Sequence, residues 1–313
     1  FKQKTAYEIG VRLVGSEMCI RDRSKICFFG PEEELVRTEH AQPAIYLVGW
    51  AALQLLKEQV PGLAFDATAG LSLGEFTALA AADALGFEDG LRVVRRRGEL
   101  MQEACEAGAG GMAAIVGLDE EAVRAVCEQA DVSLANLNCP GQIVVSGDAE
   151  KMDAACEAAK AAGAKRAISL PVAGAYHSPL MQPAQAGLAE ALAKVELREP
   201  SVPVYSNVTG QAHAGAGTIA GTMVGQVTSP VKWEACIRAM IADGVTRFIE
   251  LGPGNQAGGF VVKRLFDHNP QTGVDDQLAT HAATPGRPPL GDQGQSVLGR
   301  PRTGDAPFAG RQR

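Results

Sequence analysis

The sequence has no uncharged apolar stretch of about 18 or more residues, the length that a helix needs to cross a bilayer. Its first residues also lack a basic segment followed by an apolar segment and a small-residue cleavage site, which is the pattern of a secretory leader. We therefore expect a cytoplasmic protein without a membrane partner.

Motifs for metals and nucleotides are missing too. The 7 cysteines stand singly, without a C-x-x-C pair, so the sequence signals neither a zinc site nor a disulfide framework. H-E-x-x-H, the P-loop with its lysine, and G-x-G-x-x-G at the start of a helix do not occur. We expect no metal, no bound cofactor, and cysteines buried as small hydrophobic side chains in a reducing compartment.

Long runs of lysine or arginine are absent, and the net charge is -7, so we expect no nucleic-acid partner. Aromatic residues make up only 5% of the chain, whereas 36 residues are glycine. Small side chains suit helices packed closely on a sheet better than an aromatic-cored β-sandwich. With 46% hydrophobic residues the chain can bury a large core, and the expected fold class is α/β.

Helical and strand patterns alternate along the middle of the chain. Apolar periodicity predicts helices over 41–57, 75–85, 88–105, 184–195 and 231–243, and strands over 64–69, 203–208 and 246–251.

The segment 111–173 has a pattern of its own. Strands are expected over 112–118, in a hairpin around 138–141 and over 165–172, with helices after Asp119 and after a cap at Asp148. The resulting order, βαββαβ, is that of a ferredoxin-like unit. We expect this small subdomain to be inserted into a large subdomain made of residues 24–110 and 174–267.

Both ends differ from this middle part. Residues 1–23 show no sustained period, and we expect a foreign or disordered segment there. Residues 268–313 are rich in Gly, Pro, Gln and Arg and contain few large apolar side chains. We expect a disordered or out-of-frame tail.

A G-x-S-x-G sequence, Gly70-Leu71-Ser72-Leu73-Gly74, lies between an expected strand and an expected helix. In this context the glycines permit a tight turn that exposes the Ser72 hydroxyl, and the backbone N–H of Leu73 can stabilise an oxyanion. The alternative is a glycine-rich turn with a serine that caps the helix.

A serine nucleophile needs a base, and the sequence has only 5 histidines. His177 stands where a strand ends in a loop, a frequent position for catalytic groups, whereas His213 lies in a Gly/Ala-rich loop. His177 is therefore the candidate base, and a packed or capping histidine is the alternative.

The helix expected over 88–105 has an apolar side, and Arg97 falls in the middle of it. A guanidinium stays charged, so an inward Arg97 needs an anionic partner. An internal carboxylate or an extension along the apolar face to water would satisfy it, and so would the carboxylate of a substrate. Taken with Ser72 and His177, the last possibility indicates acyl transfer with a substrate that carries a free carboxylate.

Six segments occur in a recognisable order over roughly residues 24–267: LVRTEHAQPA, GLSLGEFTAL, RRRGELMQEA, NLNCPGQIVVSG, AYHSPLM and ELGPGN. Together they resemble the malonyl-CoA:acyl carrier protein transacylase family of bacterial-type fatty-acid synthesis. The resemblance implies an α/β-hydrolase-like large subdomain and a ferredoxin-like small one.

The same resemblance implies roles for single residues. Ser72 corresponds to the acylated nucleophile, His177 to its base, and Arg97 to the arginine that grips the malonyl carboxylate. The family's histidine is oriented by a backbone carbonyl, so no triad aspartate is expected. Further residues expected around the substrate are Gln42, Leu71, Asn138, Tyr176 and Asn255.

A reaction and its partners are implied as well. The malonyl group moves from malonyl-CoA to Ser72, and then to the phosphopantetheine thiol of acyl carrier protein, in a ping-pong mechanism. Acyl carrier proteins are acidic, so a chain with net charge -7 needs a local basic patch for docking. Lys160, Lys165 and Arg166 are candidates, with an ordinary solvated helix end as the alternative. We expect a monomer.

The chain also departs from the family pattern. The family's first strand ends in a G-Q-G motif whose glutamine is a second oxyanion donor, and residues 1–30 contain no match. Leu71 stands where histidine is usual, and Tyr176 where Phe is frequent. We therefore expect a truncated chain of low activity or stability. A serine hydrolase of the α/β class and an inactive fragment that binds carrier protein are the alternative functions.

Overall fold

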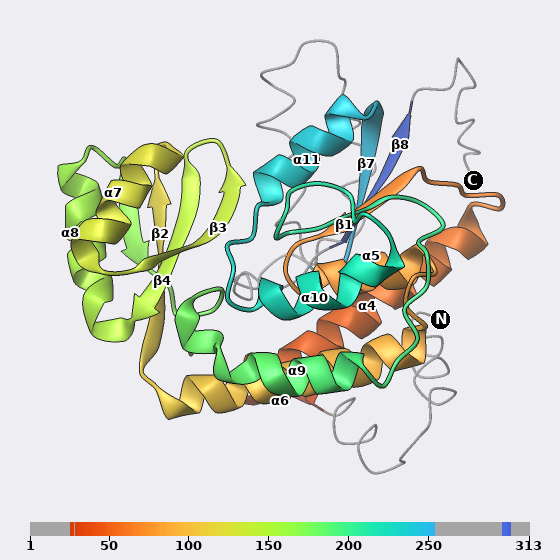
Figure 1. The fold of residues 1–313 in the computed structure, drawn as a ribbon, viewed down its shortest axis with the longest axis horizontal. Helices are drawn as coiled ribbons and strands as arrows, with labels where there is room; N and C mark the ends of the chain where they lie inside the picture. The colour runs from red at the N-terminus through yellow and green to blue at the C-terminus, as the bar shows by residue number, and fades with distance from the viewer. Residues whose placement is uncertain (1–25, 28, 254–295, 302–313) are drawn as a thin grey trace.

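The computed structural model describes residues 26, 27, 29–253 and 296–301, which form two units that lie side by side (Figure 1). The small unit, at the left of Figure 1, is one continuous segment from β2 to β5. The rest of the described chain forms the large unit.

The large unit is built on a 4-stranded sheet in the order β6-β1-β8-β7. Its strands are β1 (Ala67–Gly70), β6 (Val204–Tyr205), β7 (Val245–Leu251) and β8 (Ser296–Pro301). β1 is parallel to β6 and antiparallel to β8, which in turn is antiparallel to β7. Because every residue of β1 is buried, its backbone N–H and C=O groups need partners along both edges, and β6 and β8 supply them.

The helices of the large unit are α3 (Glu32–Leu35), α4 (Thr38–Gln59), α5 (Gly74–Ala81), α6 (Phe87–Ala107), α9 (Pro183–Leu192), α10 (Ala216–Gln226) and α11 (Trp233–Ala242), with the short 3-10 helix η2 (Pro179–Met181). Side chains alternate along a strand, so Ala67 and Ala69 of β1 face α11, whereas the Thr68 hydroxyl faces α5 and donates to Ala78 O at 3.2 Å. Helices therefore cover both faces of the sheet. α6 and α9 run alongside each other below it (Figure 1).

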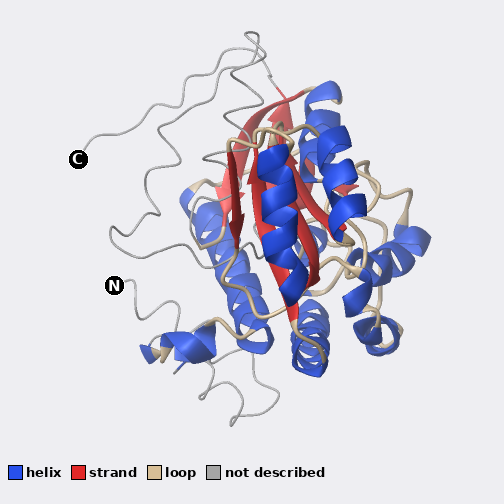
Figure 2. Ribbon diagram, turned by 90° about the vertical axis from the view of Figure 1, so that its left-hand side faces the viewer, coloured by secondary structure: helices blue, strands red, loops and turns tan. Residues whose placement is uncertain are grey.

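The small unit contains β2 (Gly110–Val116), α7 (Glu120–Ala130), β3 (Ser133–Cys139), β4 (Gln142–Asp148), η1 (Ala149–Lys151), α8 (Met152–Ala161) and β5 (Arg166–Ser169). Its strands form an antiparallel sheet in the order β3-β4-β2-β5. Figure 2 shows helices lying across the outer face of this sheet, and Ala113 and Ile115 of β2 pack beneath α7 and α8. Met112 and Ala114, which alternate with them, pack instead with the core of the large unit.

Each helix and strand expected from the sequence is present, with ends that differ by a few residues. Asp119 caps α7 as expected, accepting a hydrogen bond from the Ala122 N–H at 2.9 Å. Asp148 stands at the N-cap position of η1 as expected, but without a side-chain cap. Its side chain instead pairs with Lys151 Nζ at 2.8 Å, because a nearby ammonium competes for the same carboxylate.

α10 is a helix that the sequence pattern did not reveal. Its glycines, Gly217, Gly221 and Gly225, disfavour a helix. Ile219, Met223 and Gln226 nevertheless lie buried on one face, since their spacing follows the helical repeat. Packing of this face outweighs the low intrinsic propensity.

The prediction of a disordered tail is wrong for residues 296–301, which form β8 between β1 and β7. Strand pairing uses backbone groups of any sequence, so a segment without a clear apolar pattern can complete a buried sheet. The rest of the expected tail and the expected foreign segment 1–23 lie outside the described residues.

In the part of the chain that the structure describes, no helix is both long and apolar enough to cross a membrane. The same residues contain no group of three or more His, Cys, Asp or Glu side chains that could hold a metal ion.

Candidate active site

Ser72 lies in the turn between β1 and α5, with a backbone φ of 51°. This left-handed conformation is unusual for a residue other than glycine and indicates a strained turn. Gly70 makes the turn possible, because a Cβ at this position would lie 2.0 Å from the Gly74 carbonyl group. The local sequence thus presents the hydroxyl at the N-terminus of α5, where none of the described residues accepts a hydrogen bond from the Leu73 N–H.

His177 faces this hydroxyl, with its Nε2 2.9 Å from Ser72 Oγ. Its Nδ1 lies 2.9 Å from Gln226 O, and a carbonyl oxygen can only accept, so Nδ1 carries the proton and Nε2 is free to accept from Ser72. Burial, and after it the charge of the nearby Arg97, lowers the pKa of His177 to about 4. The imidazole is therefore neutral at pH 7 and able to act as a base.

Arg97 projects from α6 into the same pocket and is only 1% exposed. Its Nη1 donates to Gln42 Oε1 at 2.6 Å, and its Nη2 donates to Gln226 Oε1 at 3.0 Å and to Ser72 Oγ at 3.1 Å. Burial lowers the pKa of Arg97 to about 10, which still leaves it charged at neutral pH. Among the described residues its hydrogen-bond acceptors are all uncharged. The site therefore contains a buried cation that an anionic ligand can pair with.

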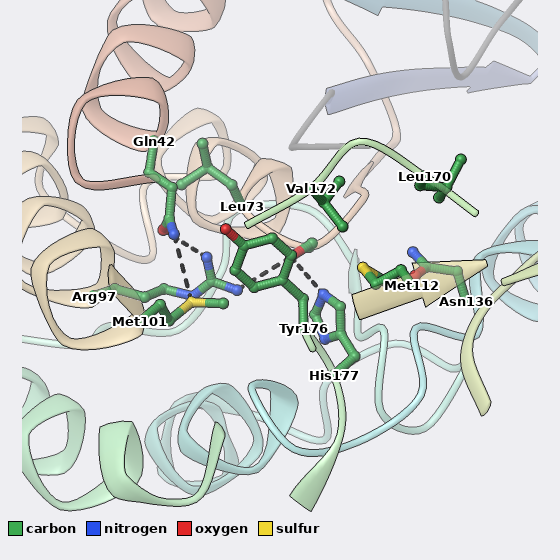
Figure 3. A pocket seen from close by; sticks show the side chains of 11 residues that line it. Gln42, Leu73, Arg97, Met101, Met112, Asn136, Leu170, Val172, Tyr176 and His177 are labelled. Atoms are coloured by element: carbon green, nitrogen blue, oxygen red, sulfur yellow. Dashed lines mark hydrogen bonds between the residues drawn. The ribbon is translucent and has the colours of Figure 1, made fainter. Parts of the chain in front are cut away.

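Both units contribute to the pocket around these groups. The large unit supplies Gln42, Ser72, Leu73, Arg97, Met101, Tyr176 and His177, and the small unit and the segment after it supply Met112, Asn136, Leu170 and Val172. Figure 3 shows Arg97 and Gln42 on one side of His177, and Met112 and Asn136 on the other. Asn136 is 1% exposed, and neither polar atom of its side chain has a partner among the described residues.

The structure brings together most of the residues singled out from the sequence: Ser72, Leu73, Arg97, Gln42, Tyr176 and His177. Two others lie elsewhere. Leu71 packs in the core between the sheet and α11, because side chains alternate on either side of Ser72. Asn138 is buried but is not part of the pocket lining, a place that Asn136 of the same strand takes. Asn255 lies outside the described residues.

Sequence reasoning missed the polar residues behind the site. Gln226 ends a helix that was not expected, and Asn207 follows a strand of only 2 residues, so neither stood out. Glu75 directly follows the G-x-S-x-G sequence, but a glutamate in the first turn of a helix is ordinarily a solvated group that favours the helix dipole. Its complete burial was not predictable from that position.

Comparisons with known proteins agree with this geometry. The family model of the acyl transferase domain matches residues 24–263. The malonyl CoA-acyl carrier protein transacylase of Bacillus subtilis (strain 168) is 47% identical over 245 residues, which cover 77% of each chain. The same enzyme of Escherichia coli (strain K12) is 41% identical over 258 residues, covering 81% of this chain and 83% of the relative.

Solved structures give the same result. The malonyl CoA-acyl carrier protein transacylase of Coxiella burnetii matches with a TM-score of 0.80 and 37% identity, covering 87% of this chain and 85% of that one. A malonyl-transacylase solved in complex with a type II PKS acyl-carrier protein matches with a TM-score of 0.77 and 36% identity, over 85% and 84% of the two chains.

Proposed function

We propose that this chain moves a malonyl group from coenzyme A to the phosphopantetheine thiol of acyl carrier protein. The chain belongs to the acyl transferase domain family, together with malonyl CoA-acyl carrier protein transacylases. The observation that carries the proposal is the buried guanidinium of Arg97, 3.1 Å from Ser72 Oγ and bonded only to uncharged acceptors among the described residues.

In the first half-reaction, His177 Nε2 takes the Ser72 proton while Oγ attacks the thioester carbonyl carbon. The Leu73 N–H stabilises the oxyanion that develops on the carbonyl oxygen. The carbon–sulfur bond then breaks, and the coenzyme A sulfur leaves with the proton from His177. In the second half-reaction the phosphopantetheine thiol gives its proton to His177 and attacks the malonyl ester, and Ser72 recovers the proton.

Arg97 binds the free carboxylate of the malonyl group. In the unliganded site its Nη2 donates to Ser72 Oγ, which draws electron density from the nucleophile. A malonyl carboxylate takes over this donor, so substrate binding also releases the hydroxyl for attack. An acetyl thioester has no carboxylate and leaves the guanidinium without an anion, which disfavours it.

We also assign the subdomains within this proposal. The strand order β3-β4-β2-β5 and the two helices on one face support a ferredoxin-like small subdomain over 111–173. The strand–turn–helix around Ser72 supports an α/β-hydrolase-like large subdomain made of 24–110 and 174–267. The basic side chains Lys160, Lys165 and Arg166 are exposed on the small unit and remain candidates for docking an acidic carrier protein.

The alternatives fit less well. A serine hydrolase leaves Arg97 without a role, and the relatives are transacylases. Low turnover, expected because residues 1–30 contain no G-Q-G motif, stays a prediction, since residues 1–25 lie outside the description.

The deciding experiment is to incubate the protein with labelled malonyl-CoA, map the label by mass spectrometry, and then add the thiol form of acyl carrier protein. We expect a malonyl ester on Ser72 that carrier protein removes and that Ser72→Ala does not form. An adduct that persists in Ser72→Ala would place the nucleophile elsewhere. Release as free malonate rather than malonyl carrier protein would instead favour the hydrolase.

A further inference from the structure

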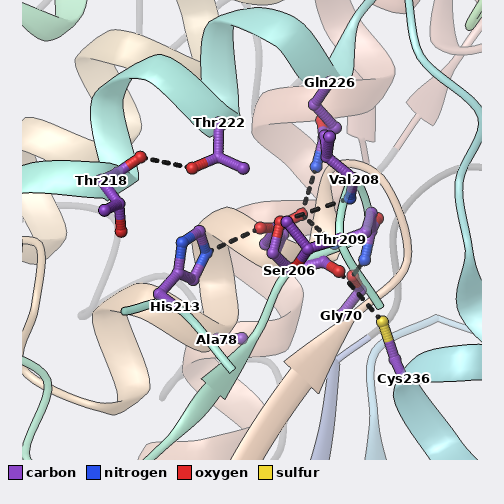
Figure 4. Close-up of polar contacts among 12 residues, drawn as sticks. Gly70, Ala78, Ser206, Val208, Thr209, His213, Thr218, Thr222, Gln226 and Cys236 are labelled. Carbon is purple, nitrogen blue, oxygen red and sulfur yellow. Dashed lines mark hydrogen bonds and ion pairs between the residues drawn. The ribbon is translucent and has the colours of Figure 1, made fainter. Parts of the chain in front are cut away.

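A carboxylate that takes no direct part in the chemistry is buried behind the nucleophile. Glu75 stands in the first turn of α5 and is 0% exposed. Its Oε1 lies 2.9 Å from His213 Nε2, and its Oε2 accepts from Gln226 Nε2 at 2.6 Å and from the Asn207 N–H at 3.1 Å. Figure 4 shows His213 and Gln226 reaching into this cluster from two sides. Both oxygens are thus held, and the carboxylate cannot rotate without losing contacts.

One of these contacts leads to the nucleophile turn. Asn207, whose backbone N–H is held by Glu75, accepts from the Ser72 N–H at 2.5 Å through its side-chain oxygen. Its side-chain nitrogen donates to Gly70 O at 2.8 Å. Asn207 therefore ties together both sides of the strained turn that presents Ser72.

The contact with Gln226 leads to the base and to the cation. Gln226 Nε2 donates to Glu75 and, at 3.0 Å, to Ser72 O, while Gln226 Oε1 accepts from Arg97 at 3.0 Å. The backbone oxygen of the same residue holds His177 Nδ1 at 2.9 Å. One residue thus touches the groups that bind, attack and accept the proton.

The direction of the Gln226 amide follows from Glu75. An ionised carboxylate only accepts hydrogen bonds, so the nitrogen end of the amide must face it and the oxygen end must face Arg97. With the amide reversed, its NH₂ group would point at the guanidinium, donor against donor. The carboxylate also places a negative charge one amide away from the buried cation.

We infer that Glu75 is a positioning residue for the acyl transfer proposed above: it sets the direction of the Gln226 amide and anchors Asn207, and through them it orders Ser72, His177 and Arg97. His213 holds the second carboxylate oxygen and completes the arrangement.

The test compares Glu75→Gln with the wild type by two rates, both measured well below the melting temperature and per folded molecule. One rate is malonyl-Ser72 formation from malonyl-CoA. The other is labelling of Ser72 by a fluorophosphonate, which needs the Ser72–His177 pair but neither Arg97 nor malonyl transfer. An amide at position 75 offers one acceptor oxygen to donors on two sides, so we expect both rates to fall by about ten- to a hundredfold.

Glu199→Gln is the matched control. Glu199 also accepts from a backbone N–H, that of Ala216, at 2.9 Å, but it is exposed and away from the pocket. We expect this variant to keep both rates whatever happens to its melting temperature. Should Glu75→Gln not fold, His213→Gln, which removes the other anchor of the carboxylate, is expected to give the same paired loss.

Unchanged rates in a folded Glu75→Gln, or in His213→Gln where that variant must be used, would show a merely structural role and overturn the inference. Because fluorophosphonate labelling needs no malonyl group, this outcome is separable from failure of the proposed function. That failure would appear as a wild-type protein that reacts with fluorophosphonate but forms no malonyl ester.

Discussion

At the scale of single residues, the site depends on a buried cation whose partners are neutral. Arg97 is hydrogen-bonded to Gln42, Gln226 and Ser72, and its Nε has no partner among the described residues. Amide oxygens neutralise a guanidinium only in part, so the pocket favours a ligand that brings its own negative charge.

We predict that Arg97→Ala lowers kcat/KM for malonyl-CoA by at least about a hundredfold, because it removes a charge-assisted contact to the carboxylate. Transfer of an acetyl group should be unchanged or faster, since the unpaired cation is gone. Steady-state kinetics with both thioesters measures the two effects. Equal losses for malonyl and acetyl groups would argue against the role of Arg97 in binding carboxylate.

Asn136 lies on the opposite side of His177 from Arg97 (Figure 3). With the malonyl carboxylate proposed to bind Arg97, we expect the rest of the thioester to extend toward Asn136. We predict that Asn136→Ala raises KM for malonyl-CoA by about tenfold through the loss of a hydrogen bond, with little change in kcat. Asn138→Ala is the control, since Asn138 lies on the same strand but not in the pocket lining. Similar KM increases in both variants would show a general effect on β3.

At the scale of elements, the nucleophile turn joins β1 to α5 with almost no free space. An added Cβ at Gly70 would lie 2.5 Å from the Glu75 N in addition to its overlap with Gly74. These are backbone atoms, so they cannot move aside as a flexible side chain would. The turn exists in this form because Gly70 has no side chain.

We predict that Gly70→Ala opens the turn, displaces Ser72 and lowers the acylation rate by about a hundredfold or more. Gly221→Ala is the counterpart in the middle of α10, where an added Cβ meets nothing within 4 Å. Because alanine is the better helix former, this variant should gain about 0.5–1 kcal/mol of stability with full activity. Acylation rates and urea unfolding midpoints test both, and an active Gly70→Ala would contradict the steric argument.

At the scale of the whole molecule, the pocket exists only where the two units meet. The inner face of the small sheet contributes Met112 and Asn136, while α4, α6 and the nucleophile turn contribute the opposite wall. Backbone hydrogen bonds from Leu137 to Val231 and from Val231 to Ala135, at 2.9 and 2.8 Å, join β3 to the segment before α11. The burial that perturbs the ionisable groups is therefore a property of the assembled protein.

Unfolding should show this burial as a pH dependence. The pKa of His177 is lowered to about 4 from an ordinary value of 6.5, so between these values the unfolded chain binds a proton that the folded protein excludes. The free energy of unfolding therefore falls as the pH drops through this window. Above about pH 6.5 His177 is neutral in both states, and its burial costs no stability. From about pH 7.5 to about pH 5 the loss should be on the order of 2 kcal/mol.

Urea unfolding of the wild type and of His177→Gln at both pH values measures this contribution. The variant lacks the ionisable ring, so it should lose less stability than the wild type on acidification. Equal losses in the two proteins would mean that the pKa of His177 does not differ between the folded and unfolded states as predicted.

Much of the site was predictable because it is encoded locally. The Ser72 turn follows from glycine spacing between a strand and a helix, and the burial of Arg97 follows from helical periodicity alone. The existence of α10 and β8 was not predictable. α10 contains poor helix formers and is stabilised by packing of its buried face. β8 is short, and it is stabilised by pairing with β1 and β7, which are distant in the sequence.

By itself, the sequence determined which segments become helices and strands around Ser72 and which side of α6 is apolar, because these depend on neighbours within a few residues. Only the tertiary structure decided that Gln226, 154 positions from Ser72 and 151 from Glu75, would bond to both. Such contacts depend on how strands order and helices pack, and hydrogen bonds to partners so far along the chain leave no periodic trace in the sequence.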